Sequence, residues 1–176
     1  MADQDKQEKY GNLKKTLIIS GIAAVFILII DTFVLGAPVF STFVFLYVVV
    51  YLLPVTLFSI RNRPKLRHFG YRLVIYTLLV ISSFGLHEYD TGVARQRAET
   101  IIAAVDAYHR DKGRYPDSLL NLVPEYISEI PQPRIFVSGT FFYPGAPEDP
   151  HLMYVDYPPF GRVSWSFNDR EWISID

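Results

Sequence analysis

The stretch from Thr16 to Ile60 constrains the fold most, because its 45 residues include a single charged side chain, Asp31. A helix of that length would extend about 65 Å at about 1.5 Å per residue, roughly twice the ~30 Å thickness of a bilayer's hydrocarbon core. The segment is therefore predicted to cross a membrane twice. Gly36-Ala37-Pro38 supplies the break, since glycine frees the backbone and proline cannot continue a helix from the preceding turn.

A third apolar segment, Tyr71 to Leu86, follows a loop rich in cations. Lysine and arginine lie before the first span and between the second and third, but are absent from the turn at Gly36. These cations are Lys6, Lys9, Lys14, Lys15, Arg61, Arg63, Lys65, Arg67 and Arg72. Because cytoplasmic loops carry the excess of positive charge, the N-terminus is predicted to be cytoplasmic and everything after residue 89 to lie outside.

Charge divides the chain at the same place. Residues 1–89 hold nine Lys/Arg against five Asp/Glu, a net charge of +4, and residues 90–176 hold eight against thirteen, a net charge of −5. An acidic outer domain does not favour nucleic acid as a partner, because the phosphate backbone attracts basic surfaces. The chain has no cysteine, which excludes disulfides, thiolate metal ligands and thiol catalysis.

The outer region carries the pattern of a long helix followed by short strands. Apolar residues recur at helical spacing between Gly92 and Arg110, and Gly113 suits the left-handed C-cap of that helix. Asp117 or Ser118 can cap a short helix that ends before Pro124. Four strands are predicted at Ile135–Tyr143, Leu152–Tyr157, Arg162–Phe167 and Trp172–Ile175. The expected fold is a long helix packed on a small antiparallel sheet, with Ile101, Leu119, Leu122 and Trp165 in the core.

The run Ala103-Ala104-Val105-Asp106-Ala107-Tyr108-His109-Arg110-Asp111-Lys112-Gly113-Arg114-Tyr115-Pro116-Asp117-Ser118-Leu119-Leu120-Asn121-Leu122-Val123-Pro124-Glu125-Tyr126 resembles a segment of type IV pilin-like proteins, especially the major pseudopilins of type II secretion. The resemblance covers about residues 71–176. It implies a pilin-like α+β domain of the bacterial envelope, behind two additional transmembrane helices. The expected location is the bacterial inner membrane, multi-pass, with residues 1–90 as a three-helix membrane anchor and residues 91–176 periplasmic.

One position departs from the family pattern. Lys65-Leu66-Arg67-His68-Phe69-Gly70-Tyr71 imitates a pilin leader, but the fifth residue after Gly70 is Ile75 where the family has a glutamate that guides assembly. The mature chain is therefore expected to keep residues 1–70, and the domain to serve as a fixed module. A true pseudopilin of a secretion system is the weaker alternative.

Two groups of polar residues are candidate ion sites. Asp31, His87, Glu88 and Asp90 are all expected near the outer ends of spans, where a proton relay or an oxygen/imidazole metal site is one interpretation and capping or solvated helix ends the other. The resemblance also implies that calcium is a conceivable ligand of the sheet loops, through Glu148, Asp149, Asp156, Asp169 and Glu171, although their spacing matches no regular calcium loop.

Aromatic side chains of the outer domain allow a recognition surface or an ordinary core: Tyr154, Tyr157, Phe160, Trp165, Phe167 and Trp172. No zinc-protease, phosphate-loop or nucleophile-elbow motif is present, and no catalytic, cofactor or metal residue is predicted. The predicted function is a non-catalytic membrane subunit whose outer domain contacts other membrane-protein subunits, with the lipid bilayer as its other partner. The alternative is a transport or energy-converting subunit with an ion or proton site at Asp31 and Glu88 or His87.

Overall fold

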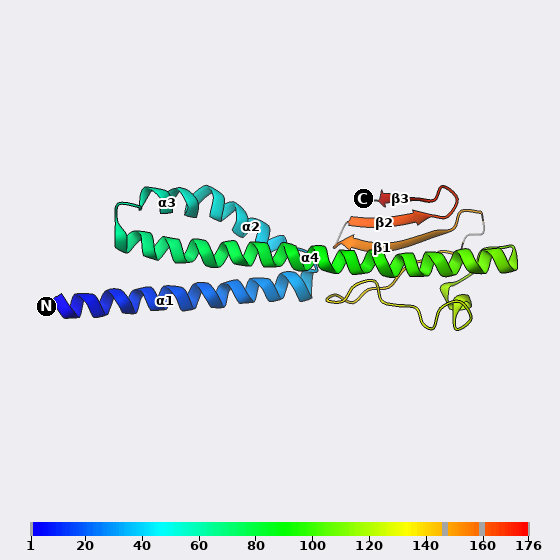
Figure 1. Ribbon diagram of the computed structural model, residues 1–176, viewed down its shortest axis with the longest axis horizontal. Coiled ribbons are helices and arrows are strands. Elements are labelled where there is room, and N and C mark those ends of the chain that lie inside the picture. Colours follow the sequence, from blue (N-terminus) through cyan, green and yellow to red (C-terminus); the bar gives the residue numbers. More distant parts are fainter. Residues whose placement is uncertain (1, 146–147, 159–160, 176) are drawn as a thin grey trace. The chain divides into compact units, whose positions relative to one another are not determined.

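The computed structural model describes residues 2–145, 148–158 and 161–175. The chain forms two compact units, Met1–His87 and Glu88–Asp176. Three helices are long and apolar enough to cross a membrane. The helices and strands are labelled in Figure 1.

The first unit contains the predicted pair of apolar helices and the start of a third. Helix α1 (Ala2–Ile29) continues into a π-helical turn, Ile30–Leu35, and ends at Gly36 in the left-handed conformation, with φ of 64°. Helix α2 (Val39–Tyr47) begins directly after Pro38. The break predicted at Gly36-Ala37-Pro38 is confirmed, because glycine adopts this positive φ without the steric cost a side chain would bring.

The second apolar helix contains a local widening just before its proline. A π-helical turn, Val48–Leu52, separates α2 from α3 (Leu53–Phe58), and the amide of Leu53 donates to the carbonyl of Val48. Pro54 follows immediately and has no amide hydrogen to donate. Its ring would also clash with the carbonyl one turn back, so the wider turn accommodates it.

Two polar contacts join the first helix to α4 (Arg63–Lys112) within the first unit. Nε of Arg72 donates to the Ser20 hydroxyl at 3.3 Å, and the Ser83 hydroxyl donates to Oδ2 of Asp31 at 3.4 Å. Each pair is separated by 52 positions in the sequence. The equal offset means that the two helices run parallel and in register. The two contacts are 11 residues apart, about three helical turns, so both fall on one facing stripe.

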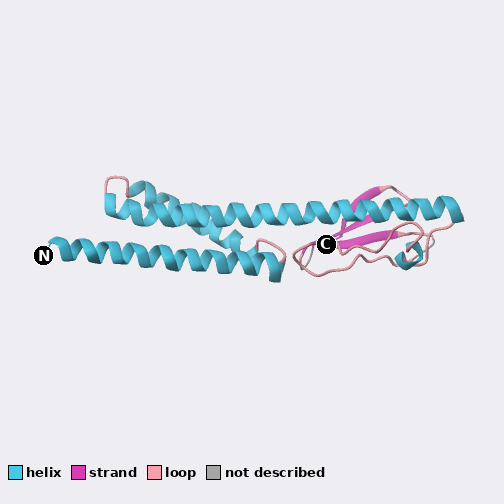
Figure 2. Ribbon diagram, turned by 60° about the horizontal axis from the view of Figure 1, so that its bottom comes forward, coloured by secondary structure: helices cyan, strands magenta, loops and turns pink. Residues whose placement is uncertain are grey.

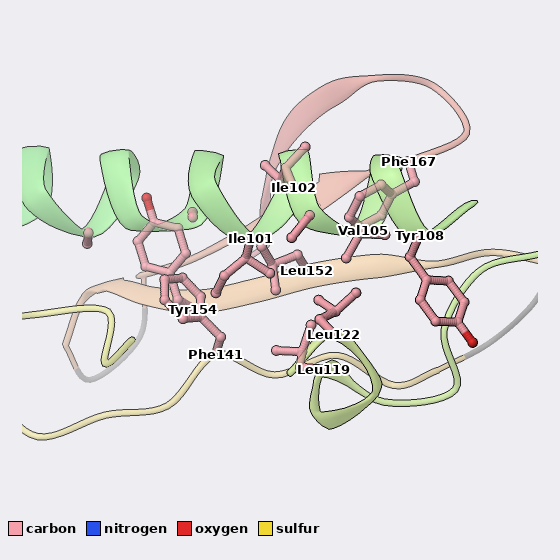
Figure 3. Packing of buried hydrophobic residues seen from close by; sticks show 13 residues of the cluster. Ile101, Ile102, Val105, Tyr108, Leu119, Leu122, Phe141, Leu152, Tyr154 and Phe167 are labelled. Atoms are coloured by element: carbon pink, nitrogen blue, oxygen red, sulfur yellow. The ribbon is translucent and has the colours of Figure 1, made fainter. Parts of the chain in front are cut away.

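The second unit is built around the C-terminal part of α4, which continues without interruption to Lys112. Its helical face and the inner face of the sheet enclose one core (Figure 3). Its largest fully buried aliphatic members are Ile101, Val105, Leu122 and Leu152. Leu119 is also buried, and Trp165 packs partly buried against the cluster. The four core residues predicted from the sequence are therefore in or against the core.

The sheet has three antiparallel strands in the order β1 (His151–Tyr157), β2 (Gly161–Ser166) and β3 (Glu171–Ile175). Leu152 pairs with Trp165, which pairs with Trp172, so these three side chains share the inner face. Met153 pairs with Ser164, which pairs with Ile173, on the opposite face. Arg95 of α4 covers the ring of Trp172, 3.8 Å from its centroid, and so links the helix to the edge strand.

The prediction of a strand at Ile135–Tyr143, the first of the four in sequence order, is wrong. Figure 2 shows this segment as loop, and only Phe142 forms a bridge, with Met153 of β1. The amides of Ile135 and Phe136 donate to the carboxylate of Asp90 instead of to a neighbouring strand. Because those two donors are already used by a side chain of α4, the start of the segment cannot join the sheet ladder.

The connection from α4 to the sheet follows the predicted turn chemistry. Gly113 has φ of 68° and its amide donates to the carbonyl of His109, which ends α4. A short 3-10 helix, Leu119–Leu122, is capped by the Ser118 hydroxyl, which accepts from the amide of Leu120. Gly145 has φ of 62° and lies so close to Asp117 that an added Cβ would clash with its carbonyl oxygen.

Candidate functional site

Asp31 caps the second apolar helix. Its side chain is 1% exposed, and its two carboxylate oxygens accept hydrogen bonds from the amides of Phe40 and Ser41, at 3.0 and 2.8 Å. These amides belong to the first turn of α2, where no backbone acceptor is available. The Ser83 hydroxyl adds a third, longer bond. The buried charge therefore lies at the N-terminal end of a helix, where the helix dipole stabilises an anion.

The other three residues of the candidate ion site have different surroundings. Glu88 is exposed and His87 is half-buried. Asp90 is 1% exposed and belongs to the second unit, where its partners are Arg134 and the amides of Ile135 and Phe136. Asp31 and Asp90 thus each bond to a separate set of protein groups, one in each unit.

A buried ion pair, which the sequence interpretation missed, organises the start of the second unit. Nε of Arg134 donates to Oδ2 of Asp90 at 2.7 Å, and both side chains are almost completely excluded from solvent. Nη1 of Arg134 also donates to the carbonyl of Asp156, at the end of β1. Arg134 is the only charged residue between Glu129 and Glu148, and an isolated cation in an otherwise uncharged stretch is a signal that could have indicated a buried partner.

A neighbouring arginine fastens the same loop. Nη1 of Arg97, two turns along α4 from Asp90, donates to the carbonyls of Gln132 and Arg134, at 2.9 and 3.3 Å. Since Pro131 and Pro133 lack amide hydrogens, this segment cannot be held by backbone donors at those positions. Asp90 and Arg97 therefore hold the loop on α4 through side chains.

The carboxylates considered for calcium do not form one cluster. Asp169 accepts from the hydroxyl of Ser166 at 2.8 Å, and Asp149 lies 3.5 Å from Nδ1 of His151. Within residues 2–145, 148–158 and 161–175, no group of three or more His, Asp or Glu side chains is placed to hold a metal ion.

The aromatic residues separate into core and surface. Tyr154 and Phe167 are buried, and Trp165 and Trp172 pack partly buried against the core, whereas Tyr157 is exposed. Phe160, the other predicted surface aromatic, lies outside the described residues. Four of the six aromatics therefore fill the core of the outer unit.

The outer sheet face is the side turned away from α4. Its exposed apolar side chains are Phe142, Val155, Ile173 and Ile175. By strand register the exposed Arg162 and Glu171 share this face. Ser164 lies between Met153 and Ile173 on this face and is itself fully buried. The Ser164 hydroxyl has no hydrogen-bond partner within the part of the chain that the structure describes. A buried hydroxyl without a partner costs stability.

Tyr143 presents a second buried hydroxyl without a partner among the described residues. Burial, with Tyr115 and Asp117 nearby, raises the pKa of Tyr143 to about 12. Burial likewise raises the pKa of Tyr154 to about 12, with the nearby Asp156 as a further cause. Both phenols therefore stay neutral at physiological pH and act as apolar rings with a polar tip.

Comparison of the chain with protein-family models, with curated proteins and with solved structures gives no match.

Proposed function

We propose that this chain is a non-catalytic integral membrane subunit of the bacterial inner membrane, in which a pilin-like domain outside the cytoplasm contacts other subunits of an envelope complex. Three helices of membrane-spanning length support the anchor. The long α4, the turn at Gly113, the short helix after Ser118 and the three-stranded sheet support the pilin-like interpretation of the outer unit.

The observation that carries the contact function is the outer sheet face. The inner face already has its partner in α4, so the exposed Phe142, Val155, Ile173 and Ile175 are not needed to complete the core. Exposed apolar side chains that gather on one face of a domain are typical of protein–protein interfaces.

The test compares two charge substitutions in the full chain. Phe142→Asp places a charge on the outer sheet face, while Leu120→Asp places one at a side chain that is 73% exposed in the short helix after Ser118. We expect Phe142→Asp to remove the partner subunits that purify with the native protein in mild detergent, and Leu120→Asp to retain them. Equal retention by the two variants would overturn the assignment of this face.

The alternative function requires Asp31 to exchange a proton or an ion. Its two carboxylate oxygens instead each accept an amide of α2, and this is the arrangement of a helix cap. We therefore propose a structural role for Asp31. A variant that keeps the complex assembled but abolishes its transport activity would favour the alternative.

A further inference from the structure

We infer that the end of the outer unit at which its chain begins, at Glu88, is a lipid-binding surface, made by Tyr89, Ile135 and Tyr157, that rests in the headgroup region of the bilayer. This inference rests on the membrane anchor of the proposed function and adds a second attachment to it. The partner is the bilayer interface itself, and not another protein.

Asp90 lies only a short distance along the chain from the third apolar segment. The apolar segment Tyr71–Leu86 has 16 residues and as a helix covers about 24 Å, less than the ~30 Å hydrocarbon core. Residues that flank a short span are drawn toward the hydrocarbon boundary. Asp90 follows Leu86 by four residues, a rise of about 6 Å, which is comparable to the thickness of one interfacial layer.

Asp90 binds the loop that contains Ile135. Its carboxylate accepts the amide of Ile135 at 2.7 Å, so the loop at Ile135 is fixed at the same level as Asp90. Arg134 connects Asp90 to the carbonyl of Asp156, which places Tyr157 at this end as well. These bonds lie within the second unit, and Figure 1 shows β1 running toward this end of that unit. The covalent link to Leu86 therefore limits how far the loop can be from the bilayer.

The side chains of this surface suit the interface between lipid and water. Tyr89, Ile135 and Tyr157 are 61, 46 and 43% exposed, and each presents an apolar body. Tyrosine is enriched at membrane–water interfaces, where its ring contacts acyl chains and its hydroxyl contacts headgroups. Asp90 and Arg134, beside the loop, are buried and neutralise each other. The exposed Glu88 precedes Tyr89 in the chain and adds one carboxylate at this level. The buried pair therefore adds no isolated charge to this surface, and the polar headgroup region, unlike the hydrocarbon core, can hold the Glu88 carboxylate.

The experiment uses the absence of native cysteine, which lets a single introduced cysteine carry an environment-sensitive fluorophore. The full chain is labelled at Ile135→Cys or Tyr157→Cys and reconstituted in phospholipid vesicles, with a quencher attached to the lipids. We expect both labels to show blue-shifted emission and loss of fluorescence when the lipid quencher is present. Two positions make the result independent of a local disturbance at either one.

Two further labels are the matched controls. Leu120→Cys reports an exposed apolar position in the short helix Leu119–Leu122. The amide of Tyr126 donates to Leu122 of that helix, and the Tyr126 ring packs on Tyr108 of α4. Tyr108 is about 27 Å along α4 from Asp90. The Leu120 label should therefore stay in water. Leu78→Cys, in the third apolar segment and 58% exposed, should be quenched by lipid.

The two control labels distinguish a failure of the lipid-binding surface from a failure of the membrane anchor. If the Leu78 label is quenched and the Ile135 label is quenched no more than the Leu120 label, the lipid-binding surface is wrong while the anchor stands. If the Leu78 label is not quenched, the membrane anchor itself is wrong, and the lipid-binding surface that rests on it is wrong as well.

Discussion

Arg134 and Asp90 form an ion pair with 2.7 Å between Nε and Oδ2, across 44 positions of the sequence and with both side chains buried. A pair of this kind gains little net stability when intact, because desolvation offsets the attraction between the charges. Removing one partner is costly, however, since the other charge stays buried alone. The pair therefore makes the outer unit depend on a residue of α4 that lies only four positions beyond Leu86.

Asp90→Ala is expected to destabilise the outer unit by about 3–5 kcal/mol, because it leaves the Arg134 charge and two amides without their acceptor. Both tryptophans, Trp165 and Trp172, belong to this unit, so tryptophan fluorescence during thermal unfolding of the full chain reports it selectively. Glu88→Ala, two positions away and exposed, is the control and should leave the transition in place. An unchanged transition in Asp90→Ala would show that the ion pair is not formed.

The stability of Asp31 variants should depend on how many acceptor oxygens remain at this position. The sequence alone suggests that Asp31→Asn is harmless, but the two carboxylate oxygens accept two different amides and an asparagine offers only one oxygen. We expect Asp31→Ala to lower stability by about 0.5–2 kcal/mol and Asp31→Asn to lower it less, because the amide keeps one acceptor oxygen. The measurement is the fraction of full-length protein that stays monodisperse in detergent after heating. Equal behaviour of wild type and Asp31→Ala would contradict the capping role.

Leu122→Ala should destabilise the outer unit by about 2–5 kcal/mol, because Leu122 is fully buried and its truncation leaves a cavity. Leu120→Ala, two residues earlier in the same short helix, removes the same atoms from an exposed side chain and should change the stability little. Thermal unfolding followed by tryptophan fluorescence compares the two. Similar losses of stability in both variants would show that the placement of the short helix against the core is wrong.

The stability of the outer unit should fall as the pH rises from 10 to 12. The folded-state pKa values of Tyr143 and Tyr154 are both about 12, above the ordinary value of 10. Below pH 10 the phenols are neutral in both states, and the full stability is present. Between pH 10 and 12 the unfolded chain loses protons that the folded chain keeps, so stability declines through this window.

Tyr143→Phe should flatten part of that decline and raise stability at neutral pH by about 1 kcal/mol, because the Tyr143 hydroxyl is buried without a partner among the described residues. Tyr157→Phe, at an exposed ring, is the control and should do neither. Thermal unfolding at several pH values between 8 and 12, on the ordinary scale of tyrosine titration, provides the measurement. A loss of stability in Tyr143→Phe would indicate that the hydroxyl has a partner after all.

The orientation is tested by reporters that are active only outside the cytoplasm. The distribution of lysine and arginine predicts that such a reporter works when it is fused after Asp176 and fails when it is inserted between residues 62 and 68. The reverse pattern would place the outer unit in the cytoplasm and contradict the proposed location.

The sequence by itself determined the features that depend on short stretches of chain. The length of an apolar run decides whether it can cross a bilayer. Glycine can adopt a positive φ and so end a helix, and the helix ends predicted at Gly36 and Gly113 both occur, with φ of 64° and 68°. The short helix after Ser118 follows for the same reason, because its cap is two residues away. The three C-terminal strands were likewise evident from alternation and turn residues.

Only the tertiary structure decided the partners of the buried polar groups. Asp31 bonds to Ser83 over 52 positions and Asp90 to Arg134 over 44, and no local pattern specifies which of many distant groups will satisfy a buried carboxylate. The same contact explains the lost strand at Ile135, whose β-forming residues suggested a ladder. Its amide donates to Asp90 instead, because a buried carboxylate needs donors and this loop supplies them.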